Sequence, residues 1–252
     1  MKSKPVTLIP IHGIPLIQPG DDLVKIILER LRISGNPLKS GDVLVLAQKI
    51  VSKAEEAMVD LRSCHPSRKA IRLARSCGKD ARLVELILRE SKKVLRQGPN
   101  LLITEHKRGW VCANAGIDYS NVPGEYVTLL PKDPDQTAKK IRRRIKALIG
   151  RDVAVLIIDS YGRPFRKGAV GVALGSSGIT ALVDKRGEED LFSYRLKSTE
   201  IALADELASA ASLLMGQTNE GIPTVIIRGL KYPKGRSKAR DLIRPEEMDL
   251  FR

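Results

Sequence analysis

The sequence predicts an α+β protein (mixed α/β), with mixed sheets packed against helices, and two observations support this. Short apolar runs typical of buried strands are intermixed with longer segments in which apolar residues recur at helical spacing. The two kinds of segment do not alternate regularly, so a repeated strand–helix–strand architecture is not indicated. We expect a single domain over residues 1–252, built as two lobes.

Apolar runs bounded by turn residues predict the strands. They lie at residues 7–17 (with a turn), 43–46, 101–104, 110–114, 153–158 and 222–229. Helical spacing predicts the helices. They lie at residues 19–34, 67–95, 133–149 and 196–215. Asp135 is the expected N-cap of the third helix, and Gly150 and Gly216 are expected to end the last two. The charged tail, 231–252, is expected to be flexible or to bind a partner.

Charge and composition restrict the function. The formal net charge is +15, which favours anionic partners, either nucleic acid or small phosphorylated ligands. Aromatic residues make up only 4% of the chain, and the basic helices lack the aromatic residues that stack on bases, so a nucleic-acid-binding protein is the weaker alternative. Three cysteines without paired metal spacing fit a reducing cytosol. No signal peptide or apolar run of about 20 residues is present, so we expect a cytoplasmic protein away from membranes.

Polar residues follow the apolar run 153–158. Asp159 and Ser160 come directly after it and offer oxygen ligands for a hard divalent cation. The basic loop that follows supplies cations suited to phosphate or carboxylate, namely Arg163, Arg166 and Lys167. The alternatives are an Asp that caps a turn and a solvated basic loop.

A second carboxylate, Asp118, lies in a loop of small residues with Asn114, Ser120 and Asn121. Two Asp residues from separate strand ends would make a Mg²⁺ or Mn²⁺ site if the fold brings them together. The alternative is an Asx turn at 118–121, a frequent use of these residue types.

Two further segments carry polar groups. Lys49 and Lys53 are four residues apart and share a face if the segment is helical, which suits an anion, although such lysines are often simply solvated. A polar loop at 217–220 follows Gly216 and could be a helix terminus only. The sequence has no Walker A motif, dinucleotide fingerprint or zinc spacing, and its three histidines form no cluster, so a serine-triad hydrolase is poorly supported.

Five segments in order resemble the archaeal-type coenzyme F420:L-glutamate ligases, from about residue 8 to residue 230. They read "GIPLIQPGDDL", "GDVLVLAQKIVSKAE", "VCANAGIDYSNV", "IIDSYGRPFRKGAVGVALGSSGI" and "ADELASAASLLMGQTNEGIPTVIIRG". The resemblance implies GTP-dependent addition of L-glutamate to coenzyme F420-0, then extension by γ-linked glutamates, with release of GDP and phosphate. It also implies an intertwined homodimer that uses Mg²⁺ or Mn²⁺ at two sites and is activated by K⁺. We expect the stand-alone form, without a C-terminal nitroreductase-like domain. A ligase of the same fold acting on another acidic acceptor is the remaining alternative.

The resemblance also assigns residues. Asp118 and Asp159 match the metal carboxylates, and Ser160 and Gln217 match positions that support a second metal. The nucleotide-binding positions match Gly13, Ile14, Pro15, Leu16, Gln48, Lys49, Lys53, Asn121, Met215, Gly216, Gln217, Thr218, Asn219, Glu220, Gly221 and Ile222. The expected reaction passes through an acyl phosphate and needs positive charge near the phosphates and the acidic substrates. We expect Lys49, Lys53 and Arg166 to supply this charge. The basic region 62–96 has no role in this pattern.

Overall fold

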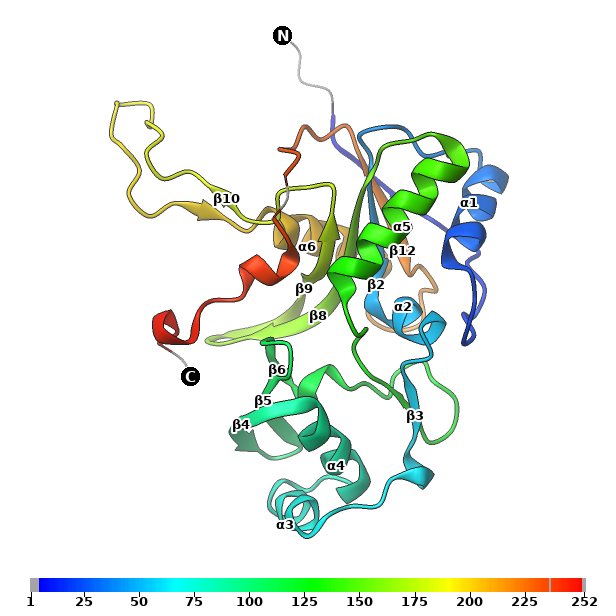
Figure 1. Ribbon diagram of the computed structural model, residues 1–252, viewed down its shortest axis with the longest axis vertical. Coiled ribbons are helices and arrows are strands. Elements are labelled where there is room, and N and C mark those ends of the chain that lie inside the picture. The colour runs from blue at the N-terminus through cyan, green and yellow to red at the C-terminus, as the bar shows by residue number, and fades with distance from the viewer. Residues whose placement is uncertain (1–4, 236, 251–252) are drawn as a thin grey trace.

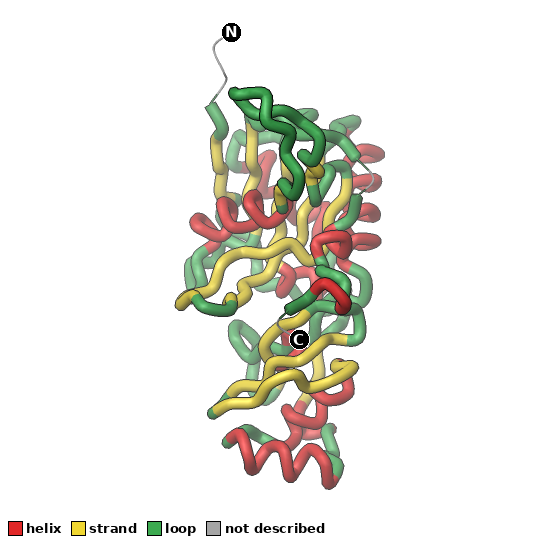
Figure 2. Tube along the Cα trace, turned by 90° about the vertical axis from the view of Figure 1, so that its left-hand side faces the viewer, coloured by secondary structure: helices red, strands yellow, loops and turns green. Residues whose placement is uncertain are grey.

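The computed structural model describes residues 5–235 and 237–250 and has two lobes arranged along the long axis of the molecule (Figures 1 and 2). Strands near both ends of the chain, β1 and β12, lie in the first lobe's sheet, and the second lobe is formed by the segment between α2 and α5. The predicted α+β class, with mixed sheets, is confirmed.

A five-stranded mixed sheet forms the centre of the first lobe. Its order is β1 (Thr7–Pro10), β12 (Thr224–Arg228), β2 (Val43–Ala47), β8 (Ala154–Arg163) and β9 (Arg166–Ser177). Only β2 and β8 are parallel neighbours, and the other pairs are antiparallel. Both faces of the central strands are buried, which explains why these strands read as continuous apolar runs.

Helices cover both faces of this sheet. One core lies under α1 (Leu23–Ile33), α2 (Gln48–Ala54) and α5 (Pro134–Ile149), and the other lies under α6 (Leu203–Met215). The predicted N-cap of α5 is wrong. Asp133 caps the helix by accepting a hydrogen bond from Gln136 N (3.0 Å), whereas Asp135 is buried and accepts from Ser176 N (2.8 Å).

The second lobe has its own aliphatic core. It contains α3 (Arg68–Cys77), α4 (Ala81–Glu90) and an antiparallel sheet of β4 (Ser91–Gly98), β5 (Leu101–His106) and β6 (Val111–Ala113). The predicted helix 67–95 is therefore wrong in its extent. Gly78 in the left-handed region ends α3, and the chain turns into β4 at Ser91, where pairing with β5 replaces helical hydrogen bonds.

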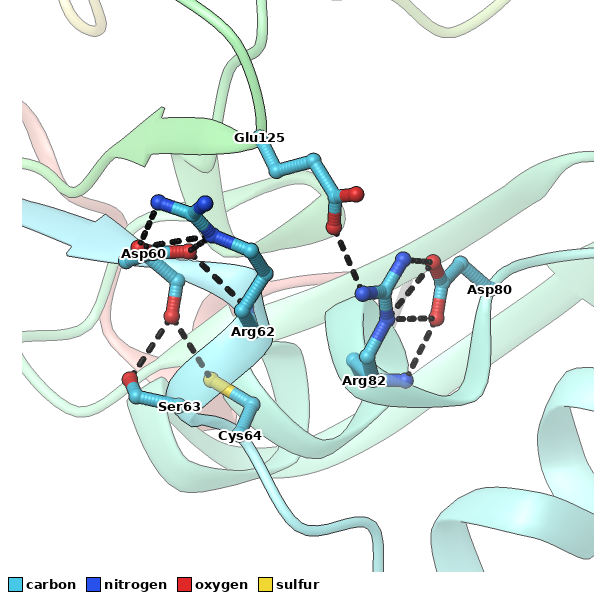
Figure 3. A network of polar contacts seen from close by, with 7 residues as sticks. All are labelled: Asp60, Arg62, Ser63, Cys64, Asp80, Arg82 and Glu125. Carbon is cyan, nitrogen blue, oxygen red and sulfur yellow. Dashed lines mark hydrogen bonds and ion pairs between the residues drawn. The ribbon is translucent and has the colours of Figure 1, made fainter.

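A short antiparallel pair joins the lobes, formed by β3 (Met58–Asp60) and β7 (Tyr126–Thr128). Figure 3 shows the ion pairs at its end: Asp60 binds Arg62, and Arg82 bridges Asp80 and Glu125. Arg82 donates to Glu125 at 2.6 Å, so α4 is tied to the start of β7. One-turn 3-10 helices occur at Leu61–Ser63, Asn114–Gly116, Ala239–Leu242 and Glu246–Met248.

A long arm projects from the first lobe before α6 (Figure 1). Its base is the pair β10 (Val183–Asp184) and β11 (Glu200–Ile201), and near its tip Leu191 and Phe192 are 99% and 91% exposed. The predicted helix 196–215 is wrong at its start, because residues up to 201 belong to this arm.

The C-terminal segment contacts both lobes. Ala239 is buried and its N donates to Asp135 Oδ1 (3.0 Å) in the first lobe. Ile243 packs with the cluster around Trp110 at the junction, and Glu246 pairs with Lys93 of the second lobe (2.5 Å). Residues 237–250 therefore fasten the two lobes together on the side away from β3 and β7 (Figure 1). No helix among the described residues is long and apolar enough to cross a membrane.

His106 gives the junction a pH dependence. The residue is 4% exposed, and Nδ1 accepts a hydrogen bond from Arg108 N (3.1 Å). Burial lowers the pKa of His106; the negative charge of Glu90 opposes this shift, while Arg108 and Lys107 add to it. The unfolded chain therefore binds a proton first as pH falls, so stability present above about pH 6.5 is lost below it.

We expect His106→Asn, which keeps an acceptor near the Nδ1 position, to lose less unfolding free energy than the unmodified protein between pH 7.5 and 5.0. Urea unfolding at both pH values measures the difference. Equal losses in the two proteins would contradict the assignment to His106.

Candidate functional site

The candidate site lies at the carboxyl ends of the two parallel strands, β2 and β8. Parallel strands end at the same edge of a sheet, and ligands commonly bind there in open α/β sheets. Asp159 lies on β8, and α2 begins directly after β2, with Lys49 in its first turn. Strand β8 continues past Asp159 to Arg163, so the expected strand end at residue 158 is wrong: the polar residues pair with β9 in a hairpin.

The second lobe contributes Asp118. Its backbone pairs with Thr128 in both directions (3.1 and 2.9 Å), which fixes the loop against β7. Oδ1 of Asp118 accepts from Ser120 N (2.7 Å), the contact expected for an Asx turn. Oδ2 accepts from Lys49 of the first lobe and also from Ser120 Oγ, so the carboxylate is held by its own turn while it faces the first lobe.

The lysines of α2 span the gap between the lobes. Lys49 Nζ donates to Asp118 Oδ2 (2.7 Å) and to Ser120 O (2.8 Å), and also contacts Ser120 Oγ. Lys53 Nζ donates to Asn121 O (2.6 Å). The predicted helical spacing of these lysines is confirmed, and both reach the same loop of the second lobe. Burial lowers the pKa of Lys53, and neighbouring Lys49 lowers it further.

The pKa values of the two carboxyl groups are shifted in opposite directions. Burial would raise the pKa of Asp118, but hydrogen bonds from Lys49 and Ser120 overcome it and hold that pKa below its usual range. Burial raises the pKa of Asp159 to about 7, and the negative charge of Asp118 adds to the rise. The positive charge of Lys49 lowers the pKa of Asp159 by less than burial raises it.

The loop after α6 completes the cluster. Ser160 Oγ donates to Gln217 Oε1 (2.7 Å), and Asn121 Nδ2 donates to Thr218 O (3.2 Å). Glu220 closes the loop by accepting from Thr218 N (2.8 Å). The structure therefore joins the segments around Asp118, Ser160 and Gln217, which are far apart in the sequence.

Other predicted residues lie differently. Gln48 is buried and accepts from Ser52 Oγ (2.8 Å) within α2. The turn at 13–16 lies at the same edge of the sheet as the carboxyl ends of β2 and β8. Just before this turn, Ile11 N donates to Thr224 O (3.0 Å) at the start of β12, next to the end of the 215–222 loop. Arg166 is exposed at the end of the β8–β9 hairpin, where it pairs with Arg163. Arg163 lies four strand residues beyond Asp159, so the backbone of Arg166 is about 13 Å from that of Asp159 along the strand. The structure does not bring Arg166 into the cluster.

Sequence reasoning missed Ser120 as a site residue. Its N–H and hydroxyl both bind the Asp118 carboxylate (2.7 and 2.9 Å), and its carbonyl accepts from Lys49. The Asp-x-Ser spacing carried the signal, because a serine two residues after an aspartate commonly closes an Asx turn. Ser120 therefore orients the carboxylate.

The donor set suits a hard cation bound together with a phosphorylated ligand. Across the part of the chain that the structure describes, no three His, Cys, Asp or Glu side chains gather as a complete metal cage. Asp118 and Asp159 supply two carboxylates, while Ser160 and Gln217 supply neutral oxygens. Mg²⁺ is usually held by one or two carboxylates together with substrate phosphates and water, and this set fits that pattern.

Fold and site together define a two-lobed α+β protein with a carboxylate–lysine cluster between its lobes. The family model described as F420-0:Gamma-glutamyl ligase matches residues 13–229. The coenzyme F420:L-glutamate ligase of Methanocaldococcus jannaschii is 52% identical over 87% of this chain and 88% of its own. The coenzyme F420:L-glutamate ligase of Methanopyrus kandleri is 50% identical over 96% of this chain and 97% of its own. That of Methanothermobacter thermautotrophicus is 47% identical over 98% of this chain and 99% of its own. The chain belongs to the coenzyme F420:L-glutamate ligase family and is a ligase.

Proposed function

We propose that this ligase uses GTP to add L-glutamate to coenzyme F420-0 and then extends the tail by γ-linked glutamates. The observation that carries the proposal is the cluster of Asp118, Lys49 and Asp159 between the lobes, at the carboxyl ends of β2 and β8. Its carboxylates and cations match what phosphoryl transfer requires, which is positioning of the donor and neutralisation of charge.

The reaction proceeds in two transfers. The terminal phosphoryl group of GTP moves to a carboxylate oxygen of the acceptor, the bond to the bridging oxygen breaks, and GDP leaves. The amine of L-glutamate then attacks the acyl carbon, the bond to the phosphate oxygen breaks, and the nitrogen gives up a proton as phosphate leaves. The acyl phosphate is needed because a free carboxylate has a poor leaving group.

The side chains divide this work. Asp118 and Asp159, with Ser160 and Gln217, would hold Mg²⁺ or Mn²⁺ at two sites, and the metal when bound would neutralise charge on the phosphates. Lys49 and Lys53 supply further positive charge from α2. The turn at 13–16 and the loop at 215–222 are the proposed nucleotide contacts. Activation by K⁺ is proposed on the family resemblance alone.

The protein is proposed to act as a homodimer. The arm between β10 and β11 supports this, because Leu191 and Phe192 in it are almost fully exposed. Exposed apolar groups of this kind commonly mark protein contacts. A second copy of the chain would cover them.

The test of the proposed function is direct. The purified protein is incubated with GTP, Mn²⁺, L-glutamate and coenzyme F420-0, and the products are examined by mass spectrometry. We expect successive additions of glutamate, with GDP and phosphate formed in equal amounts. Intact GTP and an acceptor of unchanged mass would overturn the proposal.

Arg166 is proposed to meet an acidic substrate. We expect Arg166→Ala to raise the apparent KM for L-glutamate or for the deazaflavin by about 10-fold or more, as befits loss of a charge-assisted hydrogen bond. Arg143→Ala is the matched control, because Arg143 is exposed on α5. Steady-state kinetics with each substrate varied would reject the role if both KM values stayed at the control level.

A further inference from the structure

A basic groove lies in the second lobe between α3 and β4. It has a volume of about 710 Å³, which is ample for a small molecule or a short chain. Cations from both elements line it: Lys69, Arg72, Lys92, Lys93 and Arg96. Its lining contains no Asp, Glu or aromatic residue, and its apolar part is aliphatic and half-buried. We name it the α3–β4 groove.

Part of this positive charge is not neutralised by ion pairs among the residues that the structure describes. Among the described residues, Lys69 and Arg72 have no ion-pair partner, and Arg96 donates to the carbonyl of its neighbour Leu95 (2.7 Å). Lys92 and Lys93 pair with Glu105 at 3.0 and 3.7 Å. Cations gathered in a concave surface raise the local concentration of anions.

Protection of a sheet edge explains only part of this arrangement. Strand β4 is the edge of its sheet and has two irregularities in its pairing with β5, and lysines on such a strand discourage pairing with another chain. That account covers the cations of β4. It does not cover Lys69 and Arg72, which belong to a helix and line the same groove.

We propose that the α3–β4 groove binds a chain of several carboxylates, namely the γ-linked glutamate tail. The identity of this ligand rests on the proposed function. Lys92 and Arg96 are four residues apart on β4, or about 13 Å along an extended strand, so the positive charge is spread along the groove and not gathered at one point. A chain with several charges matches this spread. The aliphatic floor suits the methylene groups of such a chain, while the lack of aromatic residues disfavours stacked bases.

The groove lies on the same small sheet as the strand that leads to the site. Strand β4 is separated from β6 by β5, a span of two strand spacings, or about 10 Å. The chain leaves β6 directly into the loop that carries Asp118. A tail that grows from the site would extend along this sheet toward the groove as glutamates are added.

Binding is tested without nucleotide or metal, so that turnover plays no part. Fluorescently labelled tetra-γ-L-glutamate is titrated with the full chain, with Lys69→Gln/Arg72→Gln, and with the control Lys139→Gln/Arg143→Gln. The control removes the same two charges from exposed positions of α5. We expect about 10-fold or greater loss of affinity in the groove variant and less than about 2-fold in the control.

Each other outcome overturns the proposal. If the unmodified protein does not bind the peptide, the groove is not a binding site for it. If both variants lose the same affinity, the binding is general charge attraction and not specific to the groove. Tripolyphosphate, a single-stranded oligonucleotide and unlabelled tetra-γ-glutamate are compared as competitors of the labelled peptide. If either of the first two displaces it at a lower concentration than tetra-γ-glutamate does, the groove binds another anion. Unfolding midpoints of both variants confirm that each is folded.

A second readout uses the ligase reaction. We expect the groove variant to add the first glutamate at the unmodified rate but to yield a shorter distribution of tails by mass spectrometry. An unchanged distribution counts against the proposal. Because peptide binding is measured without GTP, its failure is distinguishable from failure of the proposed ligase function.

Discussion

Asp159→Asn is expected to lower metal-dependent glutamate addition by more than about 100-fold while leaving the fold intact. Removing groups that merely orient metal ligands commonly costs 10- to 100-fold, and a direct carboxylate ligand should cost more. Asparagine keeps the size of the side chain but removes the charge that a cation would offset beside Asp118. Initial rates over a Mg²⁺ or Mn²⁺ titration measure the loss.

The control for this prediction lies just before the same strand, at its other end. Asp152 precedes β8 at the opposite edge of the sheet, where it pairs with Arg142 (2.6 Å) and Lys234 (3.1 Å). Asp152→Asn should therefore keep turnover. Retained activity in Asp159→Asn, or equal loss in both variants, would remove Asp159 from the site.

Asp159 also predicts a pH dependence without metal. Its folded pKa of about 7 lies above the unfolded value near 3.9, so the folded protein keeps a proton that the unfolded chain has lost. The stability this confers is complete below about pH 4 and is lost as pH rises to about 7. We expect Asp159→Asn to lack this decline in urea unfolding from pH 4 to 7. Metal affinity of the unmodified protein should rise over the same interval, with proton release.

Local pattern was sufficient for several features. The spacing of Lys49 and Lys53 predicted a shared helical face, and both lysines reach one loop. The buried strand before Asp159 was visible as an apolar run because both faces of β8 are covered. The N-cap of α5 was also within reach, since proline favours the first helical position and Pro134 follows Asp133.

Long-range pairing decided what local pattern could not. Residues 91–98 have helical-looking composition, but their partner β5 makes them a strand. The meeting of Lys49 with Asp118 joins residues 69 positions apart and depends on how the second lobe is folded back by β3 and β7. No spacing rule in the sequence contains that contact, so the sequence predicted a shared site for Asp118 and Asp159 only on the condition that the fold brings them together.

Gly175→Ala is expected to destabilise the protein by about 3 kcal/mol or more, or to prevent soluble expression. A Cβ at Gly175 would lie 2.3 Å from Pro134 C and 2.4 Å from Pro134 O. These are backbone atoms at the start of α5, so a side-chain rotation cannot relieve the clash. Overpacking usually costs 1–3 kcal/mol, and this site lies at the upper end because a helix must move.

The neighbouring contacts oppose that movement. Asp135 Oδ1 accepts from Ser176 N (2.8 Å) and from Ala239 N (3.0 Å), so β9, α5 and the C-terminal segment meet at one carboxylate. Displacing α5 breaks this buried network. Gly98→Ala is the control, because nothing lies within 4 Å of its added Cβ, and it should be neutral or slightly stabilising through the unfolded chain. Equal urea midpoints for the two variants would show that β9 and α5 do not approach as closely as the structure places them.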